Sequence, residues 1–160
     1  MRLPRAPDKQ LAGPFLPDLL ARASHALVRG FAEQLRERGT SLPVWRVLAA
    51  IHASPGLTVT GLAEACLLQQ PAMTKLLDRM ARDGLVARAP DPRDRRVVRV
   101  ALTPDGQAKA AELVAAAARY EAGVLARYPQ AERIKAALHE IIARSGPAPH
   151  AGEGGHDEGV

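Results

Sequence analysis

The chain has 160 residues, which suits one domain or one core with additional helices for association. Its composition is 47% hydrophobic but only 3% aromatic, and this favours a helical protein rich in Ala, Leu and Val. The formal net charge is +5, which favours a polyanionic partner. A single cysteine excludes an intramolecular disulfide framework. No segment has the apolar length of a signal peptide or a membrane span, so we expect a cytoplasmic protein that does not bind membranes.

The N-terminal part of the chain predicts a flexible arm and one long helix. Residues 1–13 are interrupted by prolines and charges and are expected to form the arm. Over residues 14–40, apolar positions recur at steps of three and four, which predicts an amphipathic helix. These positions are Leu16, Leu20, Ala23, Leu27, Phe31 and Leu35. Gly39 is expected to end this helix.

Two shorter helices are expected next. The first should span about residues 43–53 and stop at the Ser-Pro-Gly of residues 54–56. Its expected core side chains are Val44, Val47, Leu48 and Ile51. Thr58 is the expected N-cap of the second, which should end near Cys66.

The helix that follows carries the clearest pattern in the chain. Pro71 suits the first helical position, where no amide donor is needed. One apolar face, at i, i+3, i+4 and i+7, is formed by Met73, Leu76, Leu77 and Met80. The opposite face carries Gln70, Thr74, Lys75, Asp78 and Arg79. Gly84 stands where a helix end turns left-handed.

The residues after this helix predict a β-hairpin. The first expected strand begins with the apolar residues Leu85 and Val86. Residues 98–102, where apolar side chains alternate with others, predict the second strand. The intervening residues 89–96 carry too many charges to be buried. A helix followed by a hairpin with a charged loop is the arrangement of a winged helix.

Four segments resemble those of MarR-type transcriptional regulators. Gly-Leu-Val-Ala-Arg at residues 84–88, Asp-Arg-Arg at residues 94–96 and Leu-Thr-Pro-Asp-Gly at residues 102–106 resemble the recognition-helix exit, the wing and the wing exit of that family. Thr-Val-Thr-Gly-Leu-Ala-Glu at residues 58–64 is similar to the first helix of its helix-turn-helix. The resemblance covers roughly residues 14–144.

The chain departs from the family pattern at two positions of the helix-turn-helix. Gly61 stands where an acidic residue usually completes the capping box. Leu67 stands where the turn after the helix commonly has a small residue. Both departures concern the helix boundaries.

The resemblance implies a mainly α fold with a small β-hairpin wing. A winged helix-turn-helix is expected over residues 41–103, between the helix of residues 14–40 and two C-terminal helices over residues 104–144. These flanking helices are expected to form a dimerisation region; a monomer with an internal three-helix bundle is the alternative. The last helix has an apolar stripe made by Ile134, Leu138, Ile141 and Ile142. Residues 145–160 are expected to be a disordered tail.

The central helix and the wing predict contacts with double-stranded DNA. In the major groove, Gln pairs with adenine, Arg with guanine, and Thr contacts the thymine methyl group. The residues expected to contact DNA are Gln69, Gln70, Ala72, Thr74, Lys75, Arg79, Arg93, Arg95 and Arg96. Arg93 and Arg95 should reach the minor groove. Asp91 and Asp94 should stabilise the wing, one of them by pairing with Arg96. The alternative is that these charges form an ordinary solvated surface.

The resemblance also implies a small aromatic carboxylate effector, bound between the dimerisation helices and the winged helix. The residues expected to line its pocket are His25, Trp45, Arg46 and His52. An aromatic acid needs a flat apolar wall and a cationic end, which Trp45 with Arg46 or His25 would supply. The alternative is that Trp45 fills the core and the histidines make ordinary hydrogen bonds.

No metal, cofactor or catalytic site is predicted. His25, His52 and His139 are far apart in the sequence, with no two at metal-ligand spacing on one helix. The chain has no phosphate-binding glycine loop, nucleophile elbow or zinc-hydrolase motif, so we do not expect an enzyme. Cys66 has apolar neighbours and is expected to pack as an unactivated thiol.

The sequence therefore predicts a homodimeric transcriptional repressor that a small aromatic acid releases from a pseudo-palindromic operator. Two alternatives remain open. One is an architectural DNA-binding protein that responds to no ligand, and the other is a repressor that responds to oxidation of Cys66.

Overall fold

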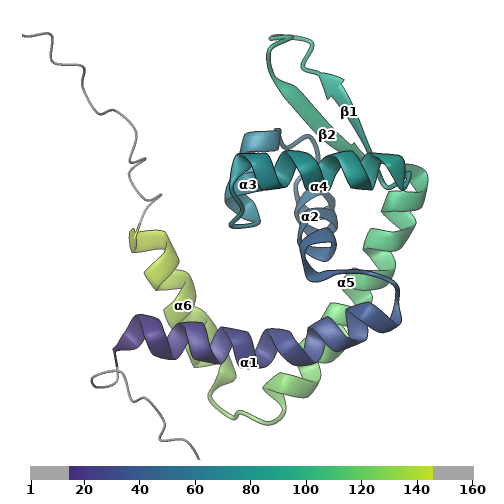
Figure 1. Ribbon diagram of the computed structural model, residues 1–160. Helices are drawn as coiled ribbons and strands as arrows, with labels where there is room; N and C mark the ends of the chain where they lie inside the picture. The colour runs from purple at the N-terminus through teal and green to yellow at the C-terminus, as the bar shows by residue number, and fades with distance from the viewer. Residues whose placement is uncertain (1–14, 146–160) are drawn as a thin grey trace, which may run out of the picture. The chain divides into compact units, whose positions relative to one another are not determined.

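The computed structural model describes residues 15–145 (Figure 1). It is mainly α with a two-stranded antiparallel hairpin, which confirms the predicted fold class. The elements in chain order are α1 (Leu16–Glu37), α2 (Leu42–Ala53), α3 (Val59–Ala65), α4 (Gln70–Arg82), β1 (Val86–Pro90), β2 (Val98–Leu102), α5 (Pro104–Leu125) and α6 (Ala131–Ser145). The arm expected over residues 1–13 and the tail expected after Ser145 lie outside the described residues. The chain divides into two compact units, and the boundary between them falls within α5, after Ala118.

The core of the first unit is built where the sequence predicted it. Along α4, the four apolar side chains of the predicted face are all buried: Met73, Leu76, Leu77 and Met80. Helix α4 packs against α2, α3 and β1, and other fully buried side chains of the unit include Leu35, Leu48, Leu62, Val100 and Leu113. Burial of each such side chain contributes about 1.5–3 kcal/mol, so this cluster holds α4 firmly on the domain.

Three helices of the first unit end in the same way. Gly39, Leu67 and Gly84 follow α1, α3 and α4 with φ of 66°, 55° and 72°. At each end, two amide groups beyond the helix donate to carbonyl groups of its last turn, as Gly84 N does to Ala81 O (3.1 Å) and Leu85 N does to Met80 O (2.9 Å). Leu67 is unusual because a branched side chain adopts the left-handed conformation, and it is 86% exposed.

The starts of α2, α3 and α4 agree with the sequence to within one residue, while α1 begins at Leu16, two residues later than predicted. The Thr58 hydroxyl accepts a hydrogen bond from Gly61 N at 3.0 Å, which confirms Thr58 as the N-cap of α3. The helix α4 begins one residue earlier than predicted, because Gln69 is its N-cap and Gln70 is already helical. Pro71 still lies in the first turn, where no amide donor is required.

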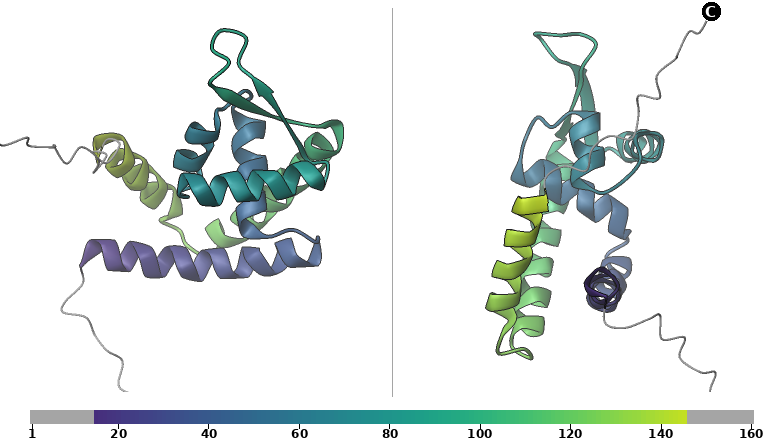
Figure 2. Two further views of the ribbon diagram at one scale, coloured as in Figure 1. Left: turned by 45° about the horizontal axis from the view of Figure 1, so that its top comes forward. Right: turned by 90° about the vertical axis from the view of Figure 1, so that its left-hand side faces the viewer.

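The hairpin is tied to the helices at its base. Val86 pairs with Leu102 and Pro90 with Val98, so residues 91–97 form the loop at its free end (Figure 2). Val100 N donates to Leu57 O at 3.0 Å in the α2–α3 connection. Val86 and Val100 are buried against the helices. The base of the hairpin therefore belongs to the helical core, while its loop extends away from it.

Helices α1 and α6 each expose an apolar stripe. On α1 and its N-cap, Phe15, the exposed apolar residues include Phe15, Leu16, Leu19 and Leu27. On α6 they include Ile134, Ile141 and Ile142, and no residue of this helix is buried. Within the second unit, α6 folds back along the end of α5 (Figure 2), where Lys135 Nζ lies 2.9 Å from Glu121 Oε1. Stripes of this kind are typical of association surfaces. Within residues 15–145, no helix is long and apolar enough to cross a membrane.

One glycine contact is predicted to be essential for the fold. A Cβ atom on Gly106, in the first turn of α5, would lie 1.9 Å from Leu85 O. We expect Gly106→Ala to lower the free energy of unfolding by about 1–3 kcal/mol or more, because a backbone atom must move. Gly123→Ala, in the same helix with open space around it, should instead raise it by up to about 1 kcal/mol. Urea unfolding followed by circular dichroism would measure both changes; equal effects would contradict the expected steric conflict.

Candidate nucleic-acid interface

The outward face of α4 carries the side chains that the sequence assigned to DNA. Gln69, at the N-cap, and Gln70, Ala72, Thr74, Lys75 and Arg79 are all exposed. Since the opposite face is fixed in the core, these side chains project from a rigid support. A helix presented in this way can enter the major groove with its amino-terminal end near the base edges.

The amide of Gln70 is held by the preceding helix. Gln70 Nε2 donates a hydrogen bond to Thr60 Oγ1 at 2.6 Å. Thr60 is the second residue of α3, and both side chains lie at the exposed surface of the helix-turn-helix. The start of α4 is thus joined to the start of α3 by a polar side-chain contact as well as by the core.

Arg88 joins the wing to the recognition face, a contact that the sequence analysis did not identify. Its guanidinium NH2 group contacts Asp78 Oδ1 and donates to Thr74 O at 3.5 Å. Arg88 Nε is buried and has no hydrogen-bond partner among the described residues. The strand alternation places Arg88 on the same side as the buried Val86, and this was the signal available in the sequence. Arg88 therefore positions α4 and is not free to reach DNA.

Asp91 organises the base of the wing loop. Although it belongs to a charged loop, its side chain is only 7% exposed. Its Oδ1 accepts from Arg93 N at 2.7 Å, and its Oδ2 accepts from Arg99 Nε. Arg99 also donates to Gly56 O in the α2–α3 connection. The backbone hydrogen bond from Arg93, followed by the Arg99 guanidinium, lowers the pKa of Asp91 below its ordinary value of 3.8.

The expected role of Arg96 in the wing needs a correction. Asp94 Oδ1 does accept a hydrogen bond from Arg96 at 2.9 Å, but the donor is the backbone amide. The guanidinium that pairs with Asp91 belongs to Arg99, because β2 brings that side chain to the base of the loop. Arg96 is exposed in the hairpin loop, as are Arg93 and Arg95. The wing tip is strongly positive.

The four residues expected to bind an effector have four different environments. His25 is exposed on α1. Trp45 packs edge-to-face on Phe31, with ring centroids 5.5 Å apart and an interplanar angle of 76°. His52 Nδ1 lies 3.3 Å from Gln107 Nε2. Arg46 is partly buried, and none of the four residues lines the pocket beside the last turn of α4.

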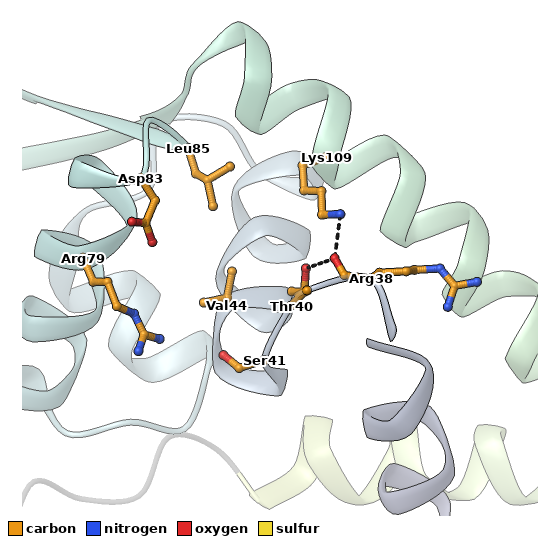
Figure 3. A pocket seen from close by; sticks show the side chains of 9 residues that line it. Arg38, Thr40, Ser41, Val44, Arg79, Asp83, Leu85 and Lys109 are labelled. Atoms are coloured by element: carbon orange, nitrogen blue, oxygen red, sulfur yellow. Dashed lines mark hydrogen bonds between the residues drawn. The ribbon is translucent and has the colours of Figure 1, made fainter. Parts of the chain in front are cut away.

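A pocket of about 600 Å³ adjoins the last turn of α4 (Figure 3). Its lining residues are Arg38, Gly39, Thr40, Ser41, Val44, Arg79, Asp83, Leu85 and Lys109. Figure 3 shows Arg79 and Asp83 on one side of it and Arg38 and Lys109 on the other. Lys109 Nζ donates to Arg38 O at 3.0 Å and so joins α5 to the α1–α2 turn. Arg79, expected at the DNA surface, also belongs to this pocket.

Cys66 is buried next to the turn of the helix-turn-helix. Burial raises the pKa of its thiol, and the charge of Arg46 opposes this only in part. A neutral, buried thiol is a poor nucleophile. This environment is that of a packing residue and does not favour oxidation sensing.

The lowered pKa of Asp91 predicts an acid-sensitive wing. Because the folded state binds this proton less readily than the unfolded state, the Asp91 carboxylate stabilises the fold above about pH 4, and this contribution is lost as the pH falls through the lower folded value. The stability difference between the wild type and Asp91→Asn should therefore be constant near neutral pH and shrink below about pH 4. Chemical unfolding across pH 3–7 would measure it, and a difference independent of pH would refute it. In an Arg99→Met background, Asp91→Asn should change the stability less, because one of the contacts that lowers the Asp91 pKa is already lost.

Comparison with known proteins adds independent evidence. A sequence profile of the MarR family matches residues 38–97. Over 89 residues the chain is 32% identical to the homoprotocatechuate degradative operon repressor of Escherichia coli, and the match spans 56% of this chain and 60% of that repressor. Over 105 residues it is 30% identical to the transcriptional repressor MdtR of Bacillus subtilis, spanning 66% of this chain and 68% of that repressor.

Solved structures extend the match over most of the described residues. The crystal structure of a MarR family transcriptional regulator from Silicibacter pomeroyi has 36% identity and a TM-score of 0.75, and the match covers 82% of this chain and 96% of that one. The S. aureus MepR–DNA complex has the same fold at 21% identity, with a TM-score of 0.69 over 82% of this chain and 98% of that one. The chain belongs to the MarR family of winged helix-turn-helix transcriptional regulators.

Proposed function

We propose that the protein is a homodimeric repressor that binds a pseudo-palindromic DNA operator and is released from it by a small aromatic acid. The observation that carries the DNA-binding step is the exposed polar face of α4 beside an arginine-rich wing tip on one rigid unit. The Arg88–Asp78 contact fixes these two surfaces with respect to each other. In this proposal, α4 reads base edges in the major groove and the wing arginines enter the adjacent minor groove.

The exposed apolar stripes support the dimer. Phe15, Leu16 and Leu19 on α1, and Ile134 and Ile142 on α6, are each about half or more exposed in the single chain. A second copy would bury them in an isologous interface. A two-fold dimer would present two α4 helices about 34 Å apart, so the half-sites of the operator should be centred about 10 base pairs apart.

The pocket at the end of α4 is the better candidate for the effector. Its lining includes Arg38, Arg79 and Lys109 against one acid, Asp83. Glu112 pairs with Arg38 and Lys109, whereas Arg79 forms no ion pair among the described residues and so favours an anion. An anion held by Arg79 would compete with DNA phosphates for the same guanidinium. Tenfold release requires the ligand to prefer the DNA-free form by only about 1.4 kcal/mol. The relative named for a homoprotocatechuate degradative operon supports an aromatic acid as the ligand.

The DNA-binding step can be tested through its salt dependence. Arg95→Ala should remove one phosphate or minor-groove contact and reduce the slope of log affinity against log salt by about one unit. Arg36→Ala, which removes an exposed arginine of α1, should leave the slope unchanged. Fluorescence anisotropy with the gene's own upstream region and with random duplex would measure both. Equal affinity for the two duplexes would favour the architectural alternative, and no change of slope in Arg95→Ala would remove the wing from the interface.

The effector site can be tested by comparing two sets of variants. Benzoate and salicylate should release DNA from the wild type, and Lys109→Met should raise the ligand concentration required by about tenfold or more, because a charge-assisted hydrogen bond is lost. His25→Ala should have no effect. Calorimetric titration of ligand into the free protein would confirm that the change lies in ligand binding. An effect of His25→Ala without an effect of Lys109→Met would favour the pocket expected from the sequence. No release of DNA at millimolar ligand would refute the effector step.

A further inference from the structure

The contact between Thr60 and Gln70 has a consequence for DNA reading. It links the first turn of α3 to the first residue of α4, at a hydrogen-bond length of 2.6 Å. Thr60 is itself well fixed, because the neighbouring Thr58 caps α3 through Gly61 N and forms a β-bridge with Arg99 of the wing. The Gln70 amide is thus attached to a rigid part of the domain, although it lies at the surface.

A glutamine amide has two chemically different ends. Reading adenine requires both, since Oε1 must accept from the base N6 group while Nε2 donates to N7. A free glutamine side chain rotates about three bonds and loses that freedom when it binds, which has an entropic cost. It can also turn its amide round and present two N–H groups, which match the paired N7 and O6 acceptors of guanine.

The hydrogen bond to Thr60 restricts this choice. One N–H of Nε2 is directed to the hydroxyl, which leaves the second N–H and Oε1 of Gln70 for a ligand. One donor beside one acceptor is the pattern that adenine requires. The contact orders the side chain before binding, and in the orientation found it directs the nitrogen end of the amide to Thr60.

We infer that Thr60 is a positioning residue that fixes the Gln70 amide and so sets the preference for adenine over guanine at one base pair of each half-site. This inference rests on the proposed DNA-binding function. In it, Thr60 acts through Gln70 and does not itself touch the base.

The tether can be tested first without DNA. In spectra of the ¹⁵N-labelled full chain, the Gln70 side-chain NH₂ signals should shift in Thr60→Val, which keeps the shape of threonine but lacks its hydroxyl. They should stay near their wild-type positions in Thr60→Ser. Unchanged signals in Thr60→Val would show that the hydrogen bond does not order the amide and would overturn the inference.

Base preference gives the second test. The preferred duplex would be selected from a random library, and the base pair at which Gln70→Ala loses discrimination would then be changed to each alternative. Thr60→Val should reduce the adenine-to-guanine preference there by about 3- to 10-fold, while its affinity for random DNA and its salt slope stay unchanged. Thr60→Ser should keep the preference. In the Gln70→Ala background, Thr60→Val should have no further effect on it.

The outcomes separate the inference from the function on which it rests. A wild type that selects no preferred duplex would overturn the proposed function and the inference with it. Wild-type selectivity that persists in Thr60→Val would overturn the inference alone. A loss that Thr60→Val causes equally in the Gln70→Ala background would also overturn it, because Thr60 would then contact DNA by itself. Melting temperatures close to that of the wild type would verify that each variant is folded.

Discussion

The close approach of Gly106 to the carbonyl of Leu85 is the constraint on which the arrangement of the domain depends. At this point α4 has ended, β1 begins, β2 has returned and α5 starts. Leu85 O accepts from Thr103 N at 3.1 Å, and the Thr103 hydroxyl donates to Gly84 O while accepting from Gly106 N. Thr103 therefore caps α5 and also holds the backbone at the end of α4. Because no side chain fits between these segments, the directions of α4 and of the wing are set together.

The arginines of the wing have two distinct physical roles. Arg88 lies on β1 and contacts Asp78 and the Thr74 carbonyl group of α4. Arg99 lies on β2 and contacts Asp91 of the wing loop and Gly56 O, so both charges are largely neutralised locally. Arg93, Arg95 and Arg96 lie beyond Pro90 in the loop and keep exposed guanidinium groups. The strand arginines make the hairpin a rigid extension of the core. The loop arginines supply the field that attracts a polyanion.

Local sequence patterns predicted most of the fold because they report local physics. The face of α4, the Thr58 cap and the turn at Gly84 depend on residues within a few positions of each other, and the structure confirms all three. Two other contacts depend on the strand register, which the sequence did not specify: the pairing of Asp91 with Arg99 and the contact of Arg88 with α4. The pocket could not be predicted either, since its walls come from segments that are adjacent only in the folded chain.

The bond from Lys109 Nζ to Arg38 O joins residues 71 positions apart, whereas the bond from Arg99 to Gly56 O joins the hairpin to a residue 43 positions away. The entropic cost of closing a loop rises gradually with its length, so this contact costs somewhat more to close than the shorter ones. We therefore expect this closure to form late in folding, after the helix-turn-helix and the wing. Interactions absent from the folding transition state act mainly on the unfolding rate. A ligand in the adjoining pocket would then prolong the lifetime of the folded chain while leaving its rate of folding nearly unchanged.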